Sequence, residues 1–186
     1  MTLPRYVKHF SIALCCVIII AAVVSLHSPS SHVRGISQRP LHTGGELVAV
    51  LLITPSCAAA NDETFKKNFR RALTMFRKDA ADRGFTSVVR GVSVSANTVE
   101  SRRFITEFAP FDEISIGYGW LNSGAIELVW RDHPGIAEIP QLLVLRRNIH
   151  VKQTSLSVSQ DSLLIRIAGV EDINRWVSAN APLNLN

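Results

Sequence analysis

The fold of this protein is decided by one stretch, LVAVLLITPSCAAANDETF, which spans residues 47–65. Its first seven residues form an uninterrupted apolar run rich in branched side chains, which is typical of a strand buried on both faces. Thr54, Pro55 and Ser56 break the run. The helical pattern that follows, over residues 62–83, carries one apolar stripe: Phe65, Phe69, Leu73, Phe76 and Ala80. A buried strand, a short turn and a long amphipathic helix therefore open the domain.

Strands and helices alternate along the rest of the chain. Further strands are predicted at 86–95, 113–117, 141–145 and 163–168, and further helices at 99–108, 124–130 and 171–179. Residues 151–159 alternate weakly, as in a hairpin arm or a loop. The early alternation predicts parallel strands with right-handed crossovers, and the last two strands are close enough in sequence to pair antiparallel. The fold class is therefore α/β.

This pattern predicts which side chains of several aromatic residues face the core. Trp130 belongs to the apolar stripe of the helix at 124–130, and Trp176 to that of the helix at 171–179. Tyr118 and Trp120 are predicted to pack against the sheet, the alternative being that they line a substrate surface. His133 lies between Asp132 and Pro134 and is interpreted as a turn residue.

A second apolar stretch, residues 10–26, contains no charge, no proline and no glycine. As a helix it reaches about 25 Å, close to the thickness of a bilayer core. Arg5 and Lys8 precede it, whereas the next cations, Arg34 and Arg39, are distant. This asymmetry predicts a single-pass anchor with a cytoplasmic N-terminus, residues 1–9, and an extracytoplasmic domain, periplasmic in a bacterium. The alternative is a cleaved signal peptide.

The segment 27–45 is rich in Ser, Pro, His and Gly and is interpreted as a flexible stalk. Residues 46–180 are long enough for one domain, with a short tail at 181–186. The net charge is +5. A basic cluster in the first helix is interpreted as its solvated face: Lys66, Lys67, Arg70, Arg71, Arg77 and Lys78. No nucleic-acid-binding motif accompanies it, so no nucleic-acid partner is expected.

The chain has three cysteines, of which Cys15 and Cys16 lie in the apolar stretch and are interpreted as small apolar residues. Cys57 is thus the only thiol of the domain. An internal disulfide is excluded there, because it would need a second cysteine. No pair of His or Cys residues has the spacing of metal ligands, so neither a metal nor another cofactor is expected.

Three segments resemble the thioredoxin-like superfamily. The first is VLLITPSCAAANDETF at 50–65, the second is GIAEIPQLLVL at 135–145, and the third is the helix EDINRWVSA at 171–179, which follows Gly169. The resemblance covers roughly residues 46–180. The pattern is closest to the branch of membrane-anchored thiol-disulfide reductases related to peroxiredoxins. It implies a three-layer α/β/α fold with a central mixed sheet.

The resemblance also implies a site. Cys57 corresponds to the catalytic cysteine and is expected at a helix N-terminus, where unpaired amide groups favour a thiolate. Pro140 corresponds to a cis-proline beside the sulfur. Pro55, Ser56, Ile139 and Pro140 are therefore the expected contacts to a partner, which would be a protein segment or a low-molecular-weight thiol.

Two departures from the superfamily pattern leave the activity open. Ala60 stands where a second cysteine is expected, and Leu51 stands where a buried carboxylate is expected. One reading is monothiol thiol-disulfide exchange through Cys57, which needs a single attacking thiolate. The alternative is a redox-inactive module that recognises a membrane-proximal protein, or a buried and inert cysteine. A peroxidatic cysteine fits less well, because Thr54 matches that signature but Val50 stands where it has a proline.

Overall fold

The computed structural model describes residues 44–152, 155–159 and 161–183. The predicted N-terminus at 1–9, the anchor at 10–26, nearly all of the stalk and the end of the tail lie outside these residues. None of the helices in the described ranges is both long enough and apolar enough to cross a bilayer.

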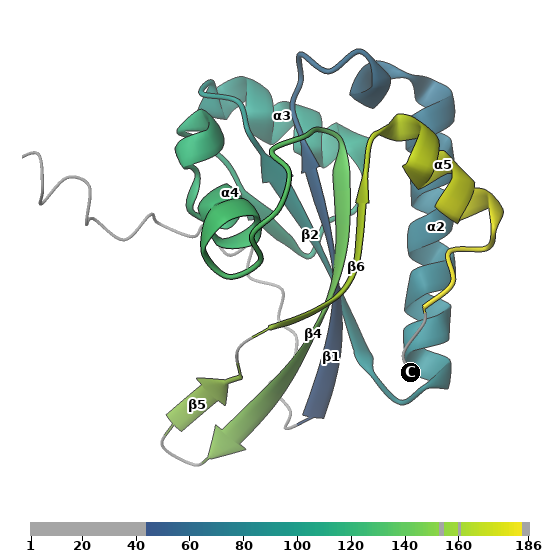
Figure 1. The fold of residues 1–186 in the computed structure, drawn as a ribbon, viewed down its shortest axis with the longest axis vertical. Helices are drawn as coiled ribbons and strands as arrows, with labels where there is room; N and C mark the ends of the chain where they lie inside the picture. The colour runs from purple at the N-terminus through teal and green to yellow at the C-terminus, as the bar shows by residue number, and fades with distance from the viewer. Residues whose placement is uncertain (1–43, 153–154, 160, 184–186) are drawn as a thin grey trace, which may run out of the picture. The chain divides into compact units, whose positions relative to one another are not determined.

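Six strands and four α-helices, joined by short helical turns, follow one another in the described residues (Figure 1). They are β1 (Gly44–Ile53), η1 (Ala59–Asn61), α2 (Glu63–Asp82), β2 (Thr86–Ser93), α3 (Thr98–Phe108), β3 (Glu113–Ser115), η2 (Gly119–Leu121), α4 (Ser123–Ile126), η3 (Glu127–Arg131), β4 (Gln141–Lys152), β5 (Ser155–Val158), β6 (Ser162–Ala168) and α5 (Val170–Ser178). The predicted elements are all present. β4 continues well past the predicted end at residue 145, and the weakly alternating segment after it forms a hairpin arm, β5.

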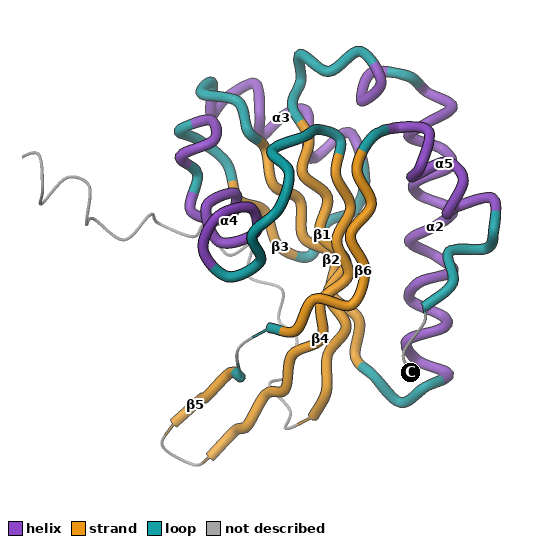
Figure 2. Tube along the Cα trace, viewed as in Figure 1, coloured by secondary structure: helices purple, strands orange, loops and turns teal. Residues whose placement is uncertain are grey.

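The strands form one mixed sheet (Figure 2). Its order is β3-β2-β1-β4-β5, and β6 also pairs with β4. β1, β2 and β3 are parallel, whereas β4 is antiparallel to β1, β5 and β6. The predicted change from parallel to antiparallel pairing is therefore confirmed. All of the antiparallel pairings among the described strands involve β4.

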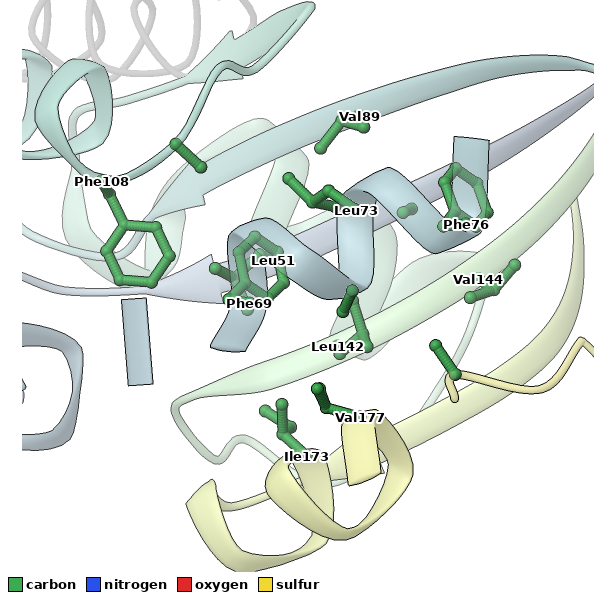
Figure 3. Packing of buried hydrophobic residues seen from close by; sticks show 14 of the residues in the cluster. Leu51, Phe69, Leu73, Phe76, Val89, Phe108, Leu142, Val144, Ile173 and Val177 are labelled. Carbon is green, nitrogen blue, oxygen red and sulfur yellow. The ribbon is translucent and has the colours of Figure 1, made fainter. Parts of the chain in front are cut away.

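The larger core lies between the sheet and the helices α2, α3 and α5. α2 and α5 run side by side on this face (Figure 1). Figure 3 shows Leu51 of β1, Phe69 of α2 and Ile173 of α5 in the same buried cluster. All five residues of the predicted α2 stripe are buried, because their spacing of three and four places them on one side of the helix. Gly84, with a φ of 76°, ends the segment as the sequence indicates.

The opposite face of the sheet is covered by α4 and η3, which pack on a second cluster that includes Val48, Val50 and Leu143. The predicted inward stripe is wrong at one position here, because Trp130 is 48% exposed. The last turn is a π-helix, and its wider turn shifts the side chains relative to an α-helical pattern. Leu128 and Val129, in the same turn, are both buried.

The predicted α/β class is confirmed. Helices cover both faces of a mixed sheet in which a parallel β1-β2 pair adjoins an antiparallel β4-β6 pair. This arrangement is the three-layer α/β/α architecture with a central mixed sheet that the sequence resemblance implied.

Candidate functional site

Cys57 lies just beyond one edge of the sheet. β1 ends at Ile53, whose carbonyl accepts a hydrogen bond from the Val94 amide at 3.0 Å. β4 begins at Gln141, which is in register with Leu52. The loop that follows β1, the loop that follows β2 and the loop that precedes β4 therefore meet at this edge.

The turn that carries Cys57 is held by its own hydrogen bonds. The Cys57 amide donates to the Thr54 carbonyl at 3.1 Å. The Asn61 side chain donates to the carbonyls of Pro55, at 2.6 Å, and Cys57, at 3.1 Å. The hydroxyls of Thr54 and Ser56 lie 3.2 Å apart. Cys57 is a free, half-buried thiol that packs against the larger core cluster.

Cys57 does not lie at a helix N-terminus, which corrects the expectation from the sequence. The turn η1 separates it from α2, whose first residue is Glu63. Asp62 is the N-cap of that helix, and its carboxylate accepts a hydrogen bond from the Phe65 amide at 2.7 Å. Asp62 can serve the first turn of the helix in this way, whereas a cysteine is a weak acceptor.

The second part of the site is the loop that leads into β4. The Ile139–Pro140 peptide bond is cis. The Pro140 carbonyl accepts a hydrogen bond from the Gly169 amide at 2.9 Å, which ties the start of β4 to the end of β6. Pro140 is buried, and Ile139 packs partly against the second core cluster. Pro55, Ser56 and Cys57 thus share one loop, while Ile139 and Pro140 immediately precede the neighbouring strand β4 at the same edge.

Exposed apolar side chains cluster in the loops of this edge. Tyr118 is 77% exposed and Leu121 is 73% exposed, so the prediction that Tyr118 packs against the sheet is wrong. Their loop is tied to the loop that follows β2 by a hydrogen bond from the Gly119 amide to the Ser95 carbonyl at 3.3 Å. Trp120 does pack against the second core cluster, and its ring lies 5.6 Å from that of Trp130. Ile136, in the loop before β4, is also exposed.

His133 is another residue whose environment differs from the prediction. It follows η3 as expected of a turn residue, but it is buried, and its Nε2 atom has no hydrogen-bond partner among the described residues. Its carbonyl accepts a hydrogen bond from the Arg166 guanidinium. Its place next to Pro134 indicated a turn, and no sequence pattern indicated that the imidazole is buried.

Sequence reasoning missed an ion cluster on the sheet face that carries α4. Arg90 lies 2.8 Å from a carboxylate oxygen of Glu113 and 3.6 Å from one of Glu127. Arg147 lies 3.2 Å from Glu46 and 3.6 Å from Glu113. Burial by itself lowers the pKa of Arg90, but the two carboxylates outweigh it, and the pKa of Arg90 is raised. The available signal was Arg90, a charge in the middle of the predicted strand at 86–95.

The described residues contain no group of three or more His, Cys, Asp or Glu side chains arranged to hold a metal ion.

Neither a protein-family model nor a curated protein sequence matches this chain. Among solved structures, the chain is similar to a thiol:disulfide interchange protein, a thioredoxin family protein from Chlorobium tepidum TLS. The two are 18% identical, the match covers 74% of this chain and 81% of that chain, and the TM-score is 0.35. A similarity of this size assigns no activity.

Proposed function

We propose that this protein is a membrane-anchored, extracytoplasmic thioredoxin-like protein that carries out thiol-disulfide exchange through the single thiol Cys57. The observation that supports the proposal most directly is the position of Cys57. It is a free, partly exposed thiol in a turn held by hydrogen bonds, at the sheet edge where Pro140 leads into β4. A polypeptide that approaches this edge meets both loops.

The reaction is a pair of exchanges. The Cys57 thiolate attacks one sulfur of a partner disulfide, the S–S bond of the partner breaks, and the second partner sulfur leaves as a thiolate. A mixed disulfide with Cys57 results. A second thiolate then attacks the partner sulfur of that mixed disulfide and releases the Cys57 thiolate, so the protein itself is neither oxidised nor reduced over the cycle.

The second thiolate comes from outside the domain. Ala60 occupies the position three residues after Cys57, and its side chain is fully buried. The other two cysteines, Cys15 and Cys16, lie in the predicted anchor. The resolving group is therefore a low-molecular-weight thiol or a thiol of the partner.

The partner class follows from the predicted anchor at 10–26 and the predicted stalk at 27–45, which would keep the domain near the membrane. A flexible coil of about eighteen residues has a typical span of roughly 20 to 25 Å. The thiol would therefore meet membrane-bound or membrane-proximal proteins more often than freely diffusing ones.

The test uses the full-length protein in detergent with Cys15→Ser and Cys16→Ser, so that Cys57 is the one remaining thiol. Glutathione disulfide is added at pH 8.5, and intact mass spectrometry follows the mixed disulfide. We expect one glutathione per native chain, release of it by a second thiol, and no adduct after Cys57→Ser. An adduct that forms in urea but not on the native protein would contradict exchange.

A redox-inactive binding module is the second candidate, and one observation favours it. The same edge lacks a second thiol and presents the exposed apolar residues Tyr118, Leu121 and Ile136. On this alternative, crosslinking of a membrane-proximal partner in cells persists after Cys57→Ser and is lost after Tyr118→Ser with Leu121→Ser. If Cys57 carries out exchange, the capture of a disulfide-linked partner should instead be lost after Cys57→Ser and persist after Tyr118→Ser with Leu121→Ser.

A further inference from the structure

We propose that Arg166 is a positioning residue, which holds the loop of residues 133–140 against the sheet and so sets how well the Cys57 site recognises a polypeptide. The loop ends at Pro140, at the same sheet edge as the Cys57 turn, and on this proposal it forms one wall of the candidate site. The inference concerns recognition of polypeptide partners in particular, and it rests on the proposed function of Cys57.

The Arg166 guanidinium bridges the two ends of this loop. Its Nη1 donates to Oε1 of Gln141 at 2.6 Å, immediately after the loop. Its Nη2 donates to the carbonyl of Leu128, at 3.0 Å, and to the carbonyl of His133, where the loop begins. One side chain of β6 therefore joins η3, the start of the loop and the start of β4.

Gln141 extends this support to the middle of the loop. Its side chain is fully buried. With its oxygen occupied by Arg166, its Nε2 donates to the carbonyls of Ile136, at 2.8 Å, and Glu138, at 3.5 Å. Arg166 and Gln141 together bind the carbonyls of residues 133, 136 and 138, so the two side chains hold the loop backbone at three points.

The loop also passes very close to the guanidinium. A Cβ atom added to Gly135 would overlap Nη1 and Cζ of Arg166. The Gly135 amide donates to the Val129 carbonyl at 3.0 Å, which keeps the backbone at this distance. Glycine is the residue that permits such an approach, so Gly135 provides a second way to disturb the contact without altering Arg166.

The charge of Arg166 is not used in an ion pair with any described residue. Its identified acceptors are two backbone carbonyls and one amide oxygen, all neutral. Burial lowers the pKa of Arg166. Arg90 and Arg147 on the same sheet face bind carboxylates instead. Arg166 differs from them because its hydrogen bonds go to the start of the loop and to the two segments that flank it.

The experiment compares Arg166→Met and Gly135→Ala with Arg147→Met in the full-length protein that retains Cys57 alone. Arg147 is a matched control, since it lies on the same face but binds Glu46 and Glu113 instead of the loop. Each variant reacts with a disulfide-containing peptide and with 2,2′-dithiodipyridine, and urea unfolding reports its stability. Arg166→Lys, which keeps one donor group, tests for partial rescue.

We expect Arg166→Met and Gly135→Ala to slow the peptide reaction by about tenfold or more, because small misplacements of a binding wall are costly. The dithiodipyridine rate should change less than about twofold, since a small disulfide needs little of that wall. Arg147→Met should leave the ratio of the two rates unchanged. Equal slowing with both disulfides, or an unchanged peptide rate, would overturn the proposal.

Hydrogen exchange separates this inference from the proposed function. We expect faster amide exchange over residues 135–139 in Arg166→Met and in a second variant, Gln141→Leu, and no change there in Arg147→Met. Unchanged exchange in both of the first two overturns the positioning role even if Cys57 is reactive. A wild-type protein that reacts with neither disulfide refutes the proposed function, and the claim about polypeptide recognition with it.

Discussion

Asn61 is the side chain that closes the turn around Cys57. It is exposed, yet its amide nitrogen binds the carbonyls on both sides of Ser56. Cys57 meanwhile keeps part of its surface against the core. A residue four positions away therefore holds the turn that carries the thiol, and the sequence pattern had not singled it out.

We predict that Asn61→Ala increases the rate at which the native protein is alkylated at Cys57 by about twofold or more. The turn loses both side-chain hydrogen bonds, while the cost in unfolding free energy is only about 1 kcal/mol because the group is exposed. The measurement is the iodoacetamide rate at fixed pH in the background that retains Cys57 alone.

Asn97→Ala is the control for this change. Asn97 caps α3 by accepting a hydrogen bond from the Glu100 amide at 3.1 Å, in the loop next to the Cys57 turn. Its loss costs a comparable amount, about 1 kcal/mol, without touching the turn. Equal alkylation rates in the two variants would show that Asn61 does not restrain Cys57.

At the scale of elements, α2 is joined to the end of α3 by a basic residue that the sequence assigned to solvent. Arg70 donates to the carbonyls of Phe108, at 2.8 Å, and Glu107, at 2.7 Å. These carbonyls belong to the last turn of α3, where backbone acceptors lack helical partners and a cation is favoured. Arg77, on the same helix, is only partly exposed and lies 3.2 Å from Asp112.

We predict that Arg70→Met lowers the unfolding free energy by about 1 to 2 kcal/mol, the range for a hydrogen bond to a charged group in a partly exposed setting. Arg71→Met is the matched control, because Arg71 is the adjacent arginine of the same helix and is exposed, as Arg70 is. It should change stability by less than about 0.5 kcal/mol. Urea denaturation of both variants provides the comparison, and equal losses would assign Arg70 to the solvated face after all.

Periodicity predicted the elements well where one regular helix or strand sufficed. Phe65, Phe69 and Phe76 are buried as their spacing indicates. It failed at Trp130, because the chain widens into a π-helix there and the spacing rule for an α-helix no longer applies. It also left β5 undecided, since an arm that pairs only with β4 carries little alternation of its own.

Across the whole molecule, the ion cluster joins four strands to the helical layer. Arg90 on β2 contacts Glu113 on β3 and Glu127 on η3, and Arg147 on β4 contacts Glu46 on β1. The side chains of Arg90 and Arg147 are only 13% and 11% exposed. Buried charges of this kind depend on their partners, because the loss of one leaves the other desolvated and unpaired.

We predict that Arg90→Met lowers the unfolding free energy by about 3 to 5 kcal/mol, since Glu113 and Glu127 lose a shared cation. Arg175→Met serves as the control. Arg175 pairs with Asp172 at 2.8 Å, but its side chain is 76% exposed, so the loss should stay below about 1 kcal/mol. Urea unfolding followed by circular dichroism measures both, and a loss under about 1 kcal/mol for Arg90→Met would show that the cluster is solvated.

The order of strands and helices, their parallel and antiparallel pairing and the inward stripe of α2 were determined by the sequence itself. They depend on apolar spacing within about twenty residues, which can be read locally. Only the tertiary structure decided the burial of His133, the exposure of Tyr118 and the contacts of Arg166 and Arg70. Those contacts join residues 25 to 38 positions apart, and no local periodicity specifies which distant carbonyl or side chain will meet a given guanidinium.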